Sequence, residues 1–199
     1  MGIKAALNQQ LLSMNIFAIN NLFDEKTRRV AREIFISRSK SETGVSTNME
    51  HGKSYFDKKW LSDKQLHLKE DPVILPVLEA IRQRTQTFIR RFAQQPRLKL
   101  DWVSCWAIVS QHGMVGRPHS HQGNISGVWY IETGDTGIYG GEIVFHGKKE
   151  QSWTPKNNQI LIFPSETVHS VKPYTSKVPR VVLPFNFRIV NDCATNNRD

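Results

Sequence analysis

The sequence has 199 residues, of which 39% are hydrophobic and 10% aromatic, and its formal net charge is +9. This composition suits one globular domain and excludes an intrinsically disordered chain, and no apolar run approaches the length of a membrane span. The positive charge permits an acidic partner such as nucleic acid, but the basic residues are scattered without interleaved aromatics, which favours a solvated basic surface.

The N-terminal segment and the cysteines indicate the compartment. Residues 1–21 lack the basic region and the clean apolar run of a signal peptide. The two cysteines, Cys105 and Cys193, form neither a disulfide framework nor a zinc-site spacing. We therefore expect a cytoplasmic protein without membrane contact, folded as one domain over residues 1–199.

Two helices are predicted within residues 1–96, which we expect to form a helical support with a loop. In the segment 20–35, apolar residues recur at spacings of three and four after a capping residue. A second helix begins near Asp71-Pro72, since proline suits the first turn, and runs to about Phe92. Residues 40–70 between them are polar and are predicted to form a long loop.

From Leu98 onward the pattern changes to short β-rich runs separated by Gly, Pro and Asn. Such a series predicts a mainly-β fold, an all-β sandwich or a jelly-roll-like barrel over residues 97–190, preceded by helices and followed by a tail at 191–199. The predicted strands are Leu98–Ser110, Ile125–Glu132, Gly141–His146, Gln159–Phe163, Val168–Lys172 and Arg180–Val190.

Three histidines in the predicted barrel are candidate metal ligands. His119 and His121 are two residues apart, and residues at that spacing in a strand point to the same face. His169 lies in a later predicted strand, and neutral imidazole is a common ligand of iron, zinc, copper and nickel. A lone His-x-His pair is usually structural, but the ordered set on strands of one barrel is far more specific.

The last predicted strand alternates in character. Apolar residues from Val181 to Ile189 alternate with a second set that includes Arg180 and Asn186. If the apolar set packs against the helices, Arg180 and Asn186 share the face that looks into the barrel. Tyr130, on the strand that follows the histidine pair, is a further candidate for a hydrogen bond in the cavity, although a core role is also open to it.

These residues carry a family resemblance. The stretch from Arg117 to Asn186 resembles the Fe(II)/2-oxoglutarate oxygenase superfamily, and most of all a group of its members found in bacteria and phages. The resemblance covers the C-terminal half, and the N-terminal helices match only in general arrangement. It rests on His119-Ser-His121, Ser126-Gly-Val-Trp-Tyr130, Gly140-Gly-Glu-Ile-Val-Phe145, Leu161-Ile-Phe-Pro-Ser165, His169 and Arg180.

The resemblance implies a role for each residue. The implied fold is a double-stranded β-helix (jelly-roll, cupin-like) barrel. His119 and His169 would hold Fe(II), and Arg180 would bind the far carboxylate of the cosubstrate 2-oxoglutarate in a bidentate manner. Tyr130 and Asn186 would be additional cosubstrate contacts. The implied enzyme is a dioxygenase that uses O2, releases succinate and CO2, and hydroxylates a protein side chain or a small molecule.

The sequence departs from the family pattern at one position. The usual facial triad is two histidines and one carboxylate, and the carboxylate normally occupies the position of His121. One interpretation is a three-histidine face. In a second, His121 is the first ligand and Gly123 fills the next position. In a third, Asp135 or Glu142 supplies a carboxylate from a neighbouring loop.

Two other functions compete with the oxygenase. A cupin-like metal enzyme without 2-oxoglutarate would use the histidines but would leave Arg180 unexplained. A non-enzymatic β-barrel binding module with a degenerate site is the other alternative. The substrate is unknown, a nucleic-acid partner is possible but not favoured, a homodimer is possible, and segments 40–70 and 111–118 are expected to carry specificity.

Overall fold

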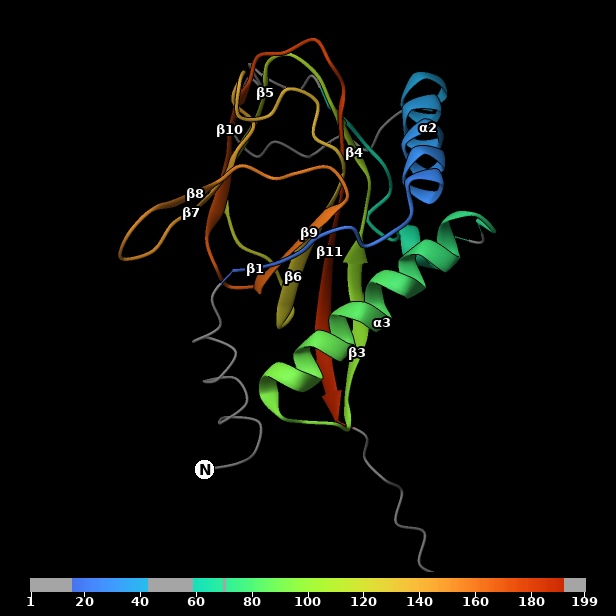
Figure 1. Ribbon diagram of the computed structural model, residues 1–199, viewed down its shortest axis with the longest axis vertical. Helices are drawn as coiled ribbons and strands as arrows, with labels where there is room; N and C mark the ends of the chain where they lie inside the picture. The colour runs from blue at the N-terminus through green and yellow to red at the C-terminus, as the bar shows by residue number, and fades with distance from the viewer. Residues whose placement is uncertain (1–15, 43–58, 70, 192–199) are drawn as a thin grey trace, which may run out of the picture.

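The computed structural model describes residues 16–42, 59–69 and 71–191 (Figure 1). Within this part, strand β1 (Phe17–Ile19) is followed by helix α2 (Glu25–Ser41). The side chain of Asp24 caps α2 by accepting a hydrogen bond from the backbone N–H of Thr27 at 2.7 Å. The predicted first helix is thus confirmed, with a shifted start and a longer C-terminal end.

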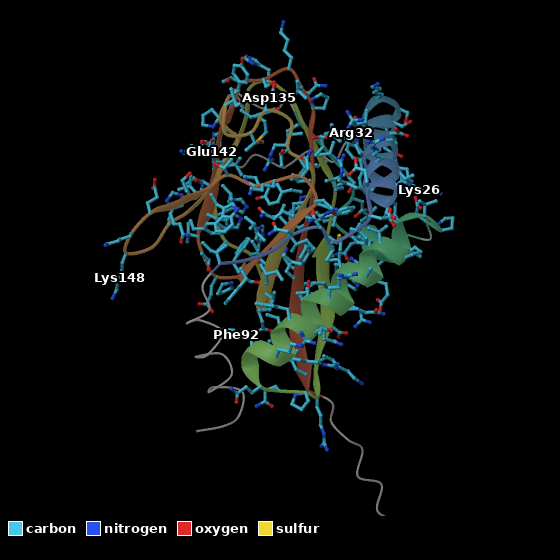
Figure 2. The ribbon with its side chains drawn as sticks, in the orientation of Figure 1. Lys26, Arg32, Phe92, Asp135, Glu142 and Lys148 are labelled. Atoms are coloured by element: carbon cyan, nitrogen blue, oxygen red, sulfur yellow. The ribbon has the colours of Figure 1, made fainter. Side chains whose placement is uncertain are left out.

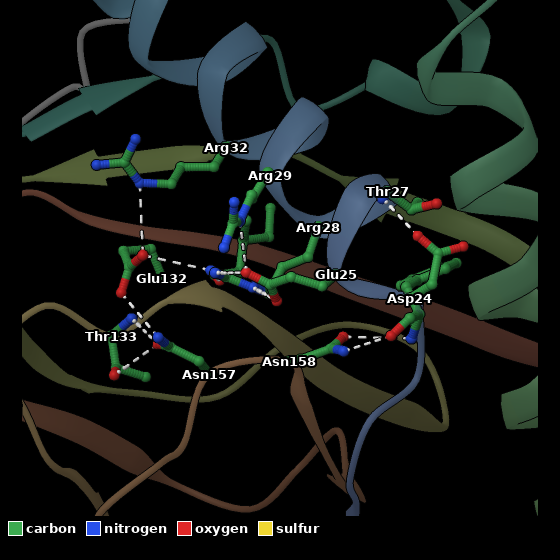
Figure 3. Close-up of polar contacts among 12 residues, drawn as sticks. Asp24, Glu25, Thr27, Arg28, Arg29, Arg32, Glu132, Thr133, Asn157 and Asn158 are labelled. Carbon is green, nitrogen blue, oxygen red and sulfur yellow. Dashed lines mark hydrogen bonds and ion pairs between the residues drawn. The ribbon is translucent and has the colours of Figure 1, made fainter.

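Arg28 anchors α2 to the barrel (Figure 3). Its side chain is buried and donates to the backbone carbonyl of Ile131 at 2.7 Å, while forming ion pairs with Glu25 at 2.6 Å and Glu132 at 3.3 Å. Arg32 reaches the same Glu132 carboxylate at 3.4 Å. A buried guanidinium is costly unless it is paired, so this network fixes one helix face against the end of one strand.

The second predicted helix is also confirmed. Helix α3 spans Ile74–Ala93, and Asp71 caps it by accepting from the backbone N–H groups of Val73 and Ile74, both at 2.9 Å. It ends at Gln94, which has a left-handed backbone with φ of 53°. No helix in the described part of the chain combines the length and the apolar character needed to cross a membrane.

The predicted loop over residues 40–70 is only partly a loop. Residues 43–58 and 70 lie outside the described residues, as do residues 1–15 and the tail from 192, which includes Cys193. The described part contains a short strand, β2 (Lys59–Leu61), and a 3-10 turn, η1 (Leu66–Leu68). Strand β2 pairs with β4, so this segment adds an edge to the sheet.

Two antiparallel sheets form the rest of the molecule. The larger sheet has the order β1-β9-β6-β11-β4-β2, with β3 also paired to β11, and the smaller has the order β5-β10-β7-β8. The two sheets enclose the barrel, which confirms the predicted double-stranded β-helix. Their strands are β3 (Leu98–Cys105), β4 (Ile108–Ser110), β5 (Met114–His119), β6 (Ile125–Glu132), β7 (Ile143–Phe145), β8 (Gln151–Trp153), β9 (Gln159–Pro164), β10 (His169–Tyr174) and β11 (Arg180–Asn191).

The long strand predicted over Leu98–Ser110 is wrong, because the structure divides it into β3 and β4. Both pair with β11, and the interruption faces Pro184. Proline has no N–H to donate, so the ladder cannot continue there. Instead the N–H of Trp106 donates to the carbonyl of Pro184 at 3.2 Å, and the ladder resumes at Ile108.

The alternation of β11 separates two apolar cores. Val181, Leu183, Phe185 and Phe187 lie in the core between the larger sheet and the helices, whereas Val182 lies in a second core inside the barrel. Helix α3 contacts β3, and α2 contacts β4, β6 and β11, so both helices cover the larger sheet (Figure 1). The predicted phase of the last strand is therefore correct, and its other face looks into the barrel.

The smaller sheet extends beyond the barrel as a hairpin. The connection between β7 and β8 projects from the body of the molecule and carries Lys148 (Figures 1 and 2), whereas all three residues of β7 are buried. Strands β1, β2 and β8 have three residues each, which is too short for a visible alternation in the sequence. This explains why the sequence pattern does not predict them.

Candidate metal centre and cosubstrate cavity

The three candidate histidines converge. His119 is the last residue of β5 and pairs in register with His169, the first residue of β10. Their potential ligand atoms and that of His121 all lie within 4.8 Å of one another. The same-face argument for His119 and His121 is wrong, however, because β5 ends at His119 and His121 lies in the turn that follows.

Backbone contacts bring His121 to the other two histidines. Its N–H donates to the carbonyl of Ser165 at 2.8 Å, and the N–H of Asn124 donates to the carbonyl of Phe187 at 2.8 Å. Between them, Gly123 has a φ of +109°, and an added Cβ would lie 2.7 Å from the Phe187 oxygen. Only glycine fits this position, so the turn is held tightly between β9 and β11.

Hydrogen bonds fix the orientation of two imidazole rings. Nδ1 of His119 lies 2.6 Å from the carbonyl oxygen of Arg117, and Nδ1 of His169 lies 3.0 Å from that of Thr167. A carbonyl can only accept, so Nδ1 carries the proton in both rings. The lone pair on Nε2 is therefore free for a metal, the arrangement that metal-binding histidines usually have.

The protonation state also suits a metal. Burial lowers the pKa of His121 to about 3, with smaller contributions from the other two histidines and from Lys64. Burial likewise lowers the pKa of His169 to about 4. Both rings are thus neutral at pH 7, which is the form that binds a transition metal.

The histidines open into one cavity of about 650 Å³ between the two sheets. We call the part formed by His119, His121 and His169 the histidine side. The opposite wall, on the larger sheet, carries Arg180 from β11, Tyr130 from β6 and Ser110 from β4, and we call it the arginine side.

Arg180 has an open donor. The residue is 3% exposed, and its Nε has no hydrogen-bond partner. Its guanidinium carbon lies 5.4 Å from the centroid of the Tyr130 ring. Burial lowers the pKa of Arg180, but a guanidinium in a protein stays protonated. A buried cation with an unused donor fits an anionic ligand group, as the far carboxylate of 2-oxoglutarate would provide.

Ser110 is a cavity residue that the sequence reasoning missed. It lies directly opposite Arg180 in the pairing of β4 with β11, it is fully buried, and its hydroxyl has no partner. Two unsatisfied buried polar groups therefore line one wall of the cavity. The register between the two strands is the signal that identifies Ser110, and it is not visible in the sequence.

Tyr130 and Asn186 both line the cavity, as predicted. Burial raises the pKa of Tyr130 to about 12, so its phenol remains a donor at neutral pH. The amide nitrogen of Asn186 donates to Ser104 at 2.9 Å, and its amide oxygen accepts from Ser126 at 2.5 Å. Asn186 is already engaged by the protein, and its role toward the cosubstrate stays a prediction.

The candidate carboxylates lie elsewhere. Asp135 accepts a hydrogen bond from the hydroxyl of Ser176, and Glu142 lies 3.6 Å from the ammonium group of Lys172. Figure 2 labels both acids. Neither lines the cavity, nor does any other Asp or Glu in the described segments. This arrangement favours the three-histidine interpretation, while the ligand set itself remains a proposal.

Comparison with known proteins agrees with this geometry. Residues 103–188 match the family model described as the 2OG-Fe(II) oxygenase superfamily. No curated protein matches the chain by sequence.

Solved structures show the same fold at low sequence identity. A Pseudomonas putida prolyl-4-hydroxylase is 17% identical with a TM-score of 0.67, and the match covers 94% of this chain and 100% of that one. A Trichoplax adhaerens prolyl hydroxylase in complex with a hypoxia inducible factor peptide is 12% identical with a TM-score of 0.66, covering 92% and 89%.

A third solved structure of this fold holds a metal ion and 2-oxoglutarate. HygX from Streptomyces hygroscopicus, solved with nickel, 2-oxoglutarate and hygromycin B, is 9% identical with a TM-score of 0.66, covering 94% of this chain and 87% of that one. The family match spans the barrel strands that carry the histidines and the arginine, and the cavity fits a metal with a carboxylate-bearing cosubstrate. Residues 103–188 thus carry the sequence pattern of the 2OG-Fe(II) oxygenase superfamily, and this match together with the cavity indicates an iron- and 2-oxoglutarate-dependent oxygenase.

Proposed function

We propose that His119, His121 and His169 hold the Fe(II) ion through Nε2 and that Arg180 binds the far carboxylate of 2-oxoglutarate. The observation that carries the proposal is that one cavity contains both a candidate metal site and a buried cation with an open hydrogen-bond donor. Three imidazoles with convergent ligand atoms face one part of it, and a buried guanidinium whose Nε has no hydrogen-bond partner faces another.

Different residues of the cavity bind the metal, orient the cosubstrate and exclude water. When bound, iron and 2-oxoglutarate supply the activation of O2, with release of succinate and CO2. The histidines fix the metal, since two of them are oriented by backbone carbonyls. Arg180, Ser110 and Tyr130 orient the cosubstrate by donating to its carboxylate. Apolar side chains such as Val128, Ile143 and Phe163 keep water away from the cavity wall.

The substrate is proposed at the level of class. The relatives were solved with a peptide or with the small molecule hygromycin B. For this chain we propose hydroxylation of a protein side chain or a small molecule. A nucleic-acid substrate is not favoured, because Lys64 and Arg180 are the only Lys or Arg side chains among the described residues that line the cavity. A homodimer stays a prediction, to be checked by light scattering.

Anaerobic spectroscopy tests the site directly. Addition of Fe(II) and 2-oxoglutarate without O2 should produce the visible charge-transfer band of the chelate. The band should be absent when either component is omitted. No band with both present would contradict the proposed function.

A further inference from the structure

We propose that the substrate carries a carboxylate, and that the ammonium group of Lys64 binds it at the mouth of the cavity. This deepens the proposed function and rests on it. The proposal assigns a specificity-determining role to a residue outside the recognised motifs. Three observations support it: the position of Lys64, the charges around the cavity and the kind of donors at the mouth.

Lys64 is held in place beside the metal site. Its carbonyl accepts from the N–H of Cys105 at 2.9 Å, which ties its backbone to the end of β3. Its Nζ lies 6.0 Å from the ring centroid of Trp106, and that ring lies 5.8 Å from the ring of His121. The side chain of Lys64 lines the same cavity as His119, His121 and His169, so its ammonium group and the histidine side share one cavity.

Neighbouring acids do not neutralise Lys64. Asp63 points to Lys69, with 3.1 Å between carboxylate oxygen and ammonium nitrogen, and also accepts from the N–H of Gln65 at 2.8 Å. Among the described residues, no ion pair involves Lys64, and no carboxylate lines the cavity. An exposed ammonium group at the rim of a cavity without acids attracts anions.

The charge of the loaded site strengthens this attraction. In the usual triad, a ligand carboxylate offsets the charge of the cosubstrate-binding arginine. Here His121 stands at that position and is neutral. The charges of Fe(II) and of 2-oxoglutarate cancel, so Arg180 and Lys64 both remain unbalanced. Uncompensated charge in a partly buried cavity is unfavourable, and an anionic group on the substrate would offset it.

The donors at the mouth favour a carboxylate over a phosphate. Phosphate groups are typically recognised by arginine clusters or by backbone nests. No arginine lies near Lys64 among the cavity residues, and the other polar groups at the rim are the neutral side chains of Gln65, Ser120 and Gln122. A single ammonium group with neutral hydrogen-bonding side chains around it suits a carboxylate, which has one negative charge.

Binding measurements test the proposal without turnover. Protein loaded with Zn(II) and 2-oxoglutarate is titrated calorimetrically with blocked tetrapeptides that differ only in a central Asp, Asn or Lys. The matching blocked single amino acids and thymidine monophosphate are titrated in parallel. We expect the Asp probes to bind about fivefold more tightly than the Asn probes, the effect of one partly exposed charge pair.

Substitutions identify the responsible residue. Lys64→Gln should abolish the preference for Asp over Asn, and Lys64→Glu should invert it toward the Lys probe. The matched control is Lys69→Gln, an exposed lysine of the same segment that pairs with Asp63 and does not line the cavity. Lys69→Gln should keep the preference for Asp over Asn. All three variants should show the same charge-transfer band with Fe(II) and 2-oxoglutarate as the unchanged protein.

The outcomes distinguish failure of the carboxylate proposal from failure of the proposed iron and 2-oxoglutarate site. A normal charge-transfer band with equal binding of Asp and Asn probes, or with no binding of either, overturns the carboxylate assignment and leaves the oxygenase site intact. Tighter binding of thymidine monophosphate than of any Asp probe overturns it in favour of a phosphate-bearing substrate. A preference confined to the tetrapeptides supports an acidic peptide, and one shared by the single amino acids supports a small acid.

Discussion

The two sides of the cavity are built in different ways. The histidine side combines the paired ends of β5 and β10 with a turn, and His119 remains exposed while His169 is buried. The arginine side lies on strands of the larger sheet, where Arg180 and Ser110 are both buried and neither the Nε of Arg180 nor the hydroxyl of Ser110 has a hydrogen-bond partner. The placement of the histidines thus depends on the geometry of a turn. Ligand binding on the arginine side depends on a buried charge carried by a strand.

The difference between the two sides shows where a group needed for ligand binding lowers the stability of the folded protein. A buried, unpaired guanidinium destabilises the protein until an anion arrives. An uncharged imidazole such as that of His169 is less costly to bury, and the rings of His119 and His169 are oriented by backbone carbonyls, which every sequence provides. We therefore expect substitutions on the arginine side to affect cosubstrate binding most, and those on the histidine side to affect the metal.

The largest expected effect is that of Arg180→Ala. It should weaken 2-oxoglutarate binding by about 3 kcal/mol, since a buried charge pair is lost, with little change in metal affinity. Titration of the charge-transfer band and separate metal titration measure the two. Without 2-oxoglutarate, Arg180→Ala should be no less stable than the unchanged protein, because an unpaired buried charge is removed.

The matched control for this substitution is Arg188→Ala. Arg188 lies on the same strand, but it is exposed and lies 3.7 Å from Asp101. It should leave 2-oxoglutarate affinity unchanged. Equal loss of metal and cosubstrate affinity in Arg180→Ala would remove the distinction between the two sides.

Substitution of His121 tests the three-histidine face. His121→Ala should weaken Fe(II) binding by about 100-fold, and His121→Asp should restore or exceed the original affinity because the usual carboxylate returns. Metal titrations with Fe(II) under argon measure both. Undiminished affinity in His121→Ala would place His121 outside the ligand set.

Acid should destabilise the metal-free protein through the same histidines. The folded-state pKa of His169, about 4, lies below the usual value of 6.5, so the unfolded chain binds a proton more readily. The stabilising contribution is full above about pH 6.5 and is lost as pH falls toward about 4, on the order of 2 kcal/mol for this residue.

Urea unfolding of the metal-free protein between pH 7.5 and 4.5 measures the loss. His169→Asn should show a shallower dependence on pH over this interval. If the slopes of the two proteins are identical, His169 is not held neutral by burial.

The smallest expected effect is that of Ser110→Ala. Loss of one hydrogen bond to the cosubstrate carboxylate should weaken 2-oxoglutarate binding by about 1 kcal/mol and leave metal binding unchanged. Ser152→Ala, on the exposed edge strand β8, is the matched control. Identical 2-oxoglutarate affinity for the two variants would show that the Ser110 hydroxyl faces another group.

Much of the architecture could be predicted from the sequence. The two helices, the barrel class and the phase of β11 follow from periodicity, because apolar residues on one face of an element must pack against another. The family and its cofactors follow from the resemblance of residues 117–186, and the later match of residues 103–188 supports both. His119, His169 and Arg180 were identifiable because they stand in that pattern.

Other features depend on contacts between distant segments. Local pattern could not predict the break at Trp106, because it is caused by Pro184 across the sheet. The position of His121 depends on hydrogen bonds that the backbone N–H groups of its turn donate to the carbonyls of Ser165 and Phe187. The short strands β1, β2 and β8 exist only through their pairing partners.

The sequence by itself thus determined the enzyme class and the candidate metal and cosubstrate residues that face the cavity. Tertiary structure decided how they meet: it left the open donors of Arg180 and Ser110 on one wall, set Lys64 at the rim and kept Asp135 and Glu142 out of the lining. The physical reason is that hydrophobic periodicity acts within one element. Register, burial and charge balance arise only when elements far apart in the chain are packed together.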